Sequence, residues 1–143
     1  MTIYKNADDD LIGVAAIVCQ IEESGLLFRV GIDPMMVGAL QDGLIEGGVQ
    51  EDKIFGVKQG MHLMGYINTA ERKLVEKNLH HNGSAMMVWM VGNCRAEQKG
   101  NIKLITKENA SGKIDCVMSL FNCCAIMSTN PEPQGEKYSL YLF

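Results

Sequence analysis

The most constraining feature of this sequence is an apolar run, Leu26 to Ile32, that is followed at once by Asp33 and Pro34. The run has the composition of a buried strand, and proline suits the first turn of a helix. The pattern therefore predicts a strand that carries the Asp33 carboxylate at its C-terminal end. Binding sites of open α/β sheets form outside the carboxyl ends of the strands. Asp33 is thus a candidate for metal binding or for acid–base chemistry.

The segments around this run predict a strand–helix–strand unit. Apolar residues have helical spacing from Pro34 to Glu46, and two glycines end that helix. The run from Lys53 to Val57 is then a second strand, which we expect to pair in parallel with the first through a right-handed connection. Upstream, Asp8 to Asp10 favour the start of a helix that Gly25 ends.

The second half of the chain predicts three more helices and one strand. We expect helices over 64–79, 85–91 and 113–127, with Ser84 as the cap of the second and Trp89 in the core. The segment from 95 to 113 carries five basic and two acidic residues. Within it, 102–107 is predicted as a strand, so Lys103 and Lys107 share one face. Lys58 lies in a turn after the second strand.

The overall composition is that of one globular domain, which we place over residues 1–143 with a loose tail from 130. The net charge of −4 argues against a stand-alone nucleic-acid binder that relies on bulk charge, although it does not exclude a local basic patch. Five cysteines without a C-x-x-C pair are typical of reduced packing residues in a cytosolic protein. The polar N-terminal residues do not resemble a signal peptide, and no apolar run approaches the roughly 18 residues of a membrane span.

Asp115 is a second candidate carboxylate, because it opens the last long helix. Phosphoryl chemistry with Mg²⁺ or Mn²⁺ needs several carboxylates that converge on the metal. A simpler interpretation is that Asp33 caps the helix after it and that Asp115 complements the dipole of its own helix. The residues by themselves leave both interpretations open.

Several short strings follow one another in order and with natural spacing between Ala7 and Glu132. They are Val30–Pro34, Gly38–Leu44, Gly56–Gly60, Thr69–Leu74, Leu79–Gly83, Trp89–Asn93, Ile105–Lys107 and Lys113–Asp115. The ordered series resembles the C-terminal half of a tailed-phage terminase large subunit. This resemblance implies an α/β fold of the ribonuclease-H-like type, here truncated, with a mixed sheet and flanking helices.

The resemblance also implies a function. In the family, the C-terminal half is a metal-dependent endonuclease that cuts concatemeric phage DNA during packaging. Of its three catalytic acids, Asp33 matches the second and Asp115 the third, so these two would bind Mg²⁺ or Mn²⁺. Lys58, Lys103 and Lys107 are the candidates for contacts with double-stranded DNA. In the parent protein, the further partners would be the small terminase subunit and the portal, in the cytoplasm of the bacterial host.

The sequence departs from the family in two respects. No segment matches the first catalytic acid, and no G-x-x-x-x-G-K-[ST] motif of an ATPase is present. We therefore expect an excised piece or a truncated prophage gene that cuts DNA weakly or not at all by itself. The missing strands would leave a sheet edge uncovered, which predicts a homodimer through that edge. The alternatives are a non-catalytic prophage remnant or assembly module, and an unrelated α/β binding protein.

Overall fold

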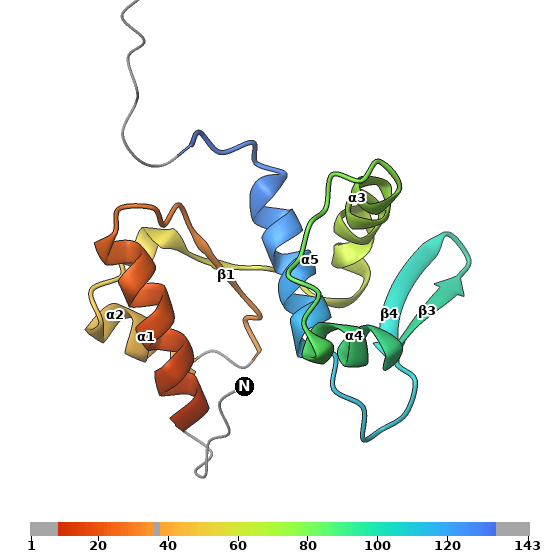
Figure 1. Ribbon diagram of the computed structural model, residues 1–143, viewed down its shortest axis with the longest axis horizontal. Helices are drawn as coiled ribbons and strands as arrows, with labels where there is room; N and C mark the ends of the chain where they lie inside the picture. Colours follow the sequence, from red (N-terminus) through yellow and green to blue (C-terminus); the bar gives the residue numbers. More distant parts are fainter. Residues whose placement is uncertain (1–8, 36–37, 134–143) are drawn as a thin grey trace, which may run out of the picture. The chain divides into compact units, whose positions relative to one another are not determined.

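The protein combines short strands with helices, as Figure 1 shows for the computed structural model, which describes residues 9–35 and 38–133. The elements are α1 (Asp9–Glu23), β1 (Val30–Ile32), α2 (Gly38–Glu46), the 3-10 helix η1 (Glu51–Lys53), β2 (Ile54–Gly56), the 3-10 helix η2 (Gly60–Leu63), α3 (Met64–Val75), α4 (Ala85–Gly92), β3 (Cys94–Lys99), β4 (Ile102–Lys107) and α5 (Asp115–Met127). The predicted mixture of helices and strands is confirmed. Most of the predicted loose tail from 130 lies outside the described residues.

The strands form two separate two-stranded sheets, β1 with β2 and β3 with β4. The chain itself divides into two compact units. Unit 1 comprises residues 1–30, 36–55 and 131–143, and unit 2 comprises residues 31–35 and 56–130. The parallel direction of the first strand pair and the single domain both stay predictions. No helix among the described residues is long and apolar enough to cross a membrane.

Unit 1 has a small core between α1 and α2. Leu44 of α2 is completely buried there, and Ala15, Leu27 and Val49 pack in the same cluster. An ion pair of 2.7 Å between Lys53 Nζ and Glu22 Oε2 closes one side of this core. Since both side chains are partly buried, this pair is screened less than a surface pair and helps to hold η1 on α1.

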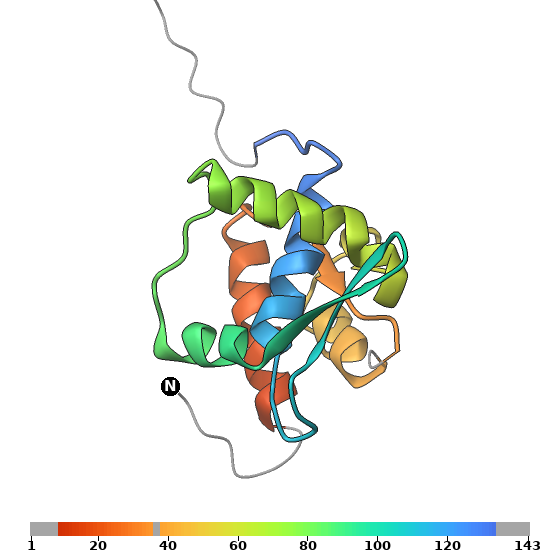
Figure 2. The ribbon, with the colours of Figure 1, turned by 90° about the vertical axis from the view of Figure 1, so that its right-hand side faces the viewer.

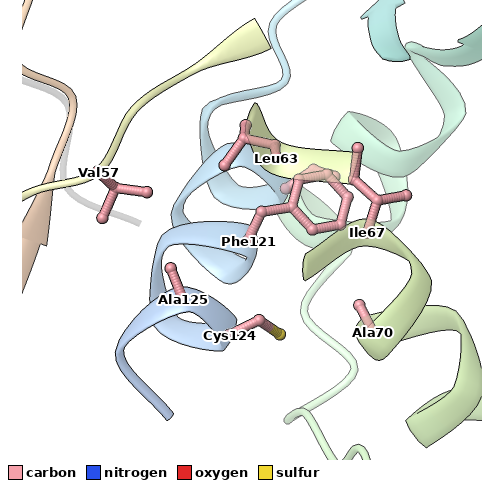
Figure 3. Packing of buried hydrophobic residues seen from close by; sticks show 8 residues of the cluster. Val57, Leu63, Ile67, Ala70, Phe121, Cys124 and Ala125 are labelled. Carbon is pink, nitrogen blue, oxygen red and sulfur yellow. The ribbon is translucent and has the colours of Figure 1, made fainter. Parts of the chain in front are cut away.

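Unit 2 has its core between α5, α3 and η2. Figure 3 shows the ring of Phe121 pointing from α5 toward Leu63 and Ile67, all three of which are buried. Figure 2 shows α3 crossing α5, so the ring fills the space at the crossing. This packing explains why α5 is apolar on most of its surface. It also fixes Asp115, the first residue of α5, to the rest of unit 2.

The basic segment of unit 2 forms a β-hairpin. Strand β4 occupies the predicted range, whereas β3 is a strand that we did not predict. Their antiparallel register places Ala96 opposite Ile105 and Gln98 opposite Lys103. We missed β3 because its sequence, Cys-Arg-Ala-Glu-Gln-Lys, has no β-branched residue. Pairing with β4 therefore overrides the weak strand propensity of β3.

Other predictions of element boundaries were wrong. Residues 34 and 35 form a turn, and α2 begins at Gly38 instead of Pro34. Helix α3 ends at Val75 instead of residue 79, because Lys77 takes a left-handed backbone conformation with φ 57°. The first strand shrinks to its last three residues, β1. Trp89 is 50% exposed, so its assignment to the core is also wrong.

The predicted cap of α4 is confirmed, because the Ser84 side chain accepts a hydrogen bond of 3.2 Å from the Met87 N–H. We expect Ser84→Ala to lower the free energy of unfolding of unit 2 by about 1 kcal/mol, since a helix-end donor loses its partner. Urea unfolding followed by the fluorescence of Trp89 measures this change. Ser119→Ala, at an exposed position of α5, is the control and should stay within about 0.5 kcal/mol. Equal losses in both variants would contradict the capping role.

Candidate functional site

Asp33 lies directly after β1 and is partly buried. Its Oδ1 accepts a hydrogen bond of 2.9 Å from the Met35 N–H, which is the pattern of an Asx turn. Because residues 34 and 35 form this turn, the interpretation of Asp33 as the cap of a helix opened by Pro34 is wrong. The second carboxylate oxygen has no hydrogen bond or ion pair among the described residues. Asp33 therefore keeps one carboxylate oxygen that could coordinate a metal at the predicted strand end.

Asp115 is the first residue of α5 and is exposed. Its carboxylate makes no hydrogen bond or ion pair within the described part of the chain. The position in the first helical turn agrees with a favourable interaction with the helix dipole. That interpretation and a ligand role are compatible, since an exposed carboxylate in a first helical turn can still offer its oxygens to a metal.

Both carboxylates belong to unit 2, on elements that touch each other. An added Cβ at Gly31 would lie 3.2 Å from the carbonyl oxygen of Asn122, so β1 approaches α5 closely two residues before Asp33. Asn122 follows Asp115 by two helical turns. Carboxylate oxygens suit Mg²⁺ and Mn²⁺, so the two side chains fit as ligands. No group of three or more metal-binding side chains occurs among the described residues. That Asp33 and Asp115 converge on one metal ion stays a prediction.

The three candidate DNA contacts have different surroundings. Lys58 is exposed after β2, and Lys107 is exposed at the end of β4. Lys103 forms an ion pair of 2.5 Å with Glu71 of α3, and its side chain is only 27% exposed. This pair joins the hairpin to α3 and compensates the charge of Lys103. Of the three lysines, Lys58 and Lys107 therefore keep a charge that a phosphate could use.

The charges of the chain are separated between the two units. Unit 2, with both candidate carboxylates, contains nine basic and six acidic residues, a formal charge of +3. Unit 1 contains four basic and eleven acidic residues, a formal charge of −7. The net charge of −4 is therefore the sum of an acidic unit and a basic unit. The argument from net charge against a nucleic-acid binder does not apply to unit 2 taken by itself.

Two of the five cysteines are poor candidates for a nucleophile or a soft metal ligand. All five are free thiols, and Cys124 is buried while the others are partly or fully exposed. Burial raises the pKa of the Cys94 thiol and that of the Cys124 thiol, which Cys123 raises further and Lys73 lowers. A raised pKa keeps a thiol protonated at neutral pH and makes it a poor nucleophile or ligand. These two residues therefore act as packing groups.

Sequence reasoning missed one polar contact beside the candidate site. The Gln59 amide nitrogen donates a hydrogen bond of 3.1 Å to Asn122 Oδ1, across 63 positions of the chain. The available signal was Asn122 itself, a polar residue inside an otherwise apolar helix sequence. The contact links the segment after β2 to α5.

The chain matches one known protein family. The family model described as terminase large subunit, endonuclease domain, matches residues 9–130, close to the span of the resemblance found in the sequence. Because this match covers most of the chain, the protein belongs to the terminase large subunit endonuclease domain family. Comparison with curated proteins and with solved structures gave no match.

Proposed function

We propose that this chain forms part of a divalent-metal-dependent endonuclease site that cuts double-stranded phage DNA, in a ribonuclease-H-like fold. The observation that carries this proposal is the placement of Asp33 and Asp115. Both have free carboxylate oxygens, on contacting elements of the basic unit, in a chain of the terminase endonuclease family. Each of the two residues also matches a catalytic acid in the resemblance drawn from the sequence.

Asp33 and Asp115 would hold Mg²⁺ or Mn²⁺ through their oxygens. The bound ion would activate water and stabilise the negative charge that develops on the scissile phosphate. Lys58 and Lys107 would neutralise backbone phosphates of the DNA, which is the main sequence-independent source of affinity. Lys103 would contribute less, because Glu71 already compensates its charge.

The proposed site needs a third ligand that the described residues do not provide. We therefore propose weak cutting by this chain alone, in the cytoplasm of a bacterial host. A homodimer through the edge of the β1–β2 sheet would be one way to add a ligand. In the intact packaging machine, the small terminase subunit and the portal would be the other partners.

Replacing either aspartate by asparagine should weaken Mn²⁺ binding by about tenfold or more. Mutation of a residue that only hydrogen-bonds to a metal ligand already lowers metal affinity by about tenfold or more, and loss of the ligand itself should lower it at least as much. The measurement is a titration of the ¹⁵N-labelled chain with Mn²⁺, followed by paramagnetic broadening of the amide signals. In the unsubstituted chain, the signals of residues 33 and 115 should broaden together, with one dissociation constant. Asp33→Asn and Asp115→Asn should each shift the broadening at both positions to at least about tenfold higher Mn²⁺ concentration.

Asp42→Asn is the matched control, because Asp42 is an exposed aspartate of α2 in the acidic unit. It should leave the broadening of residues 33 and 115 unchanged. Broadening at an unchanged Mn²⁺ concentration in both Asp33→Asn and Asp115→Asn would refute the ligand assignment. A plasmid-nicking assay separates the nuclease from the remnant, since Mn²⁺-dependent nicking that Asp33→Asn abolishes would exclude a non-catalytic remnant.

A further inference from the structure

Asn122 is the one buried polar side chain among the described residues, with 8% of its surface exposed. A buried amide is costly unless it forms hydrogen bonds. Asn122 Oδ1 accepts a hydrogen bond of 3.1 Å from Gln59 Nε2. The same nitrogen of Gln59 donates a bond of 2.7 Å to the carbonyl oxygen of Val57. The amide of Gln59 therefore connects the backbone after β2 to the middle of α5.

Gly31 brings β1 to the same place. A Cβ at this position would lie 3.2 Å from the Asn122 carbonyl oxygen and 3.3 Å from Val57 Cγ2. One residue further, the Ile32 carbonyl oxygen accepts a hydrogen bond of 2.8 Å from the Val57 N–H. Gly31, Val57, Gln59 and Asn122 thus form one contact between β1, the segment after β2, and α5, which we name the amide seam.

The amide seam lies close to both candidate ligands, because Gly31 precedes Asp33 on β1 and Asn122 follows Asp115 on α5. Asp33 is two residues beyond Gly31, about 7 Å along an extended strand. Asp115 is two turns before Asn122, about 10 Å along the helix. A slide of β1 along α5 would therefore change the separation of the two carboxylates. An apolar side chain packs with little directional preference, whereas a hydrogen bond between two side-chain amides favours one register.

We infer that Gln59 and Asn122 are positioning residues that fix the register of β1 on α5, and thereby the separation of Asp33 and Asp115. This inference rests on the proposed function, because it assigns the amide seam a role in metal binding. Metal ligands must be held within about half an ångström of their productive positions. The Gln59–Asn122 hydrogen bond holds the segment after β2 on α5, and the Val57–Ile32 backbone bond holds β1 on that segment, so the two together supply such a constraint. Neither side chain needs to touch the metal or the DNA.

The test uses Gln59→Ala and Asn122→Leu, both of which remove the amide hydrogen bond. Asn122→Leu also keeps a side chain of similar volume in the buried position. Each variant should weaken Mn²⁺ binding about tenfold in the broadening titration. The signals of residues 33 and 115 should then broaden with different dissociation constants, because one ion no longer bridges both. The double variant should be no weaker than either single variant, since both changes remove the same bond.

Gln98→Ala is the matched control, because the Gln98 amide also donates to a backbone carbonyl, that of Gly100, at a distance of 2.7 Å. It should not change Mn²⁺ binding. If Asn122→Leu fails to fold, Gln59→Ala still tests the same hydrogen bond, because the Gln59 side chain is only partly buried. Wild-type affinity with joint broadening in Gln59→Ala would overturn this inference alone. Absence of broadening in the unsubstituted chain would overturn the proposed metal site and this inference together.

Discussion

Phe121→Ala should lower the free energy of unfolding of unit 2 by about 3–5 kcal/mol, the loss typical of a large aromatic residue removed from a core. The ring is 6% exposed and points into the core cluster with Leu63 and Ile67 (Figure 3). Its removal takes away apolar burial and leaves a cavity at the crossing of α5 with α3. Urea unfolding monitored by Trp89, the sole tryptophan, reports on this unit.

Met127→Ala provides the matched control for this change. Met127 is on the same helix but is 60% exposed, so its replacement should alter the free energy of unfolding by no more than about 0.5 kcal/mol. Similar losses in the two variants would show that the Phe121 ring is not the centre of this core. A loss confined to Phe121→Ala would confirm that α5 is held to α3 mainly through this side chain.

Gly47→Ala should lower the stability of unit 1 by about 1–3 kcal/mol, the usual cost of overpacking. A Cβ at Gly47 would lie 2.2 Å from Cys19 Sγ and 3.1 Å from the carbonyl oxygen of Gly43. The thiol must move, and the backbone oxygen leaves little room for adjustment. Faster amide hydrogen exchange in α1 and α2 would report the destabilisation, because these helices form the core of unit 1.

Two further variants show whether the thiol causes this effect. Cys19→Ala in the Gly47→Ala background should recover part of the lost protection, since the closest atom is removed. The two changes should therefore be clearly non-additive. Gly38→Ala, at the first residue of α2 with open space around the added methyl group, should not weaken protection. Equal loss of protection in Gly38→Ala and Gly47→Ala would rule out the steric explanation.

The parts of the fold that sequence predicted best are those with a local cause. Residues 102–107 include the β-branched side chains of Ile102, Ile105 and Thr106, and they form β4 over the predicted range. Ser84 directly precedes an apolar helix and caps it. The turn at Asp33 was misjudged, because Pro34 is compatible with a helix start and with a turn. Only the hydrogen bond from the Met35 N–H to Asp33 distinguishes the two.

The parts that sequence could not predict depend on contacts between distant residues. The polar strand β3 exists because β4 pairs with it, and Trp89 is exposed because the apolar α4 is only partly covered. The candidate ligands themselves were identified from the sequence. The hydrogen bond that supports them was not, because Gln59 and Asn122 are 63 positions apart in the chain. The ion pair that compensates Lys103 was missed for the same reason.

The separation of charge between the two units has a consequence for the first encounter with DNA. A polyanion attracts unit 2, with its formal charge of +3, and repels unit 1, with its formal charge of −7. The two units would therefore respond to DNA with opposite signs, whatever their arrangement. Salt would weaken both responses, because the screening length is about 8 Å at physiological ionic strength.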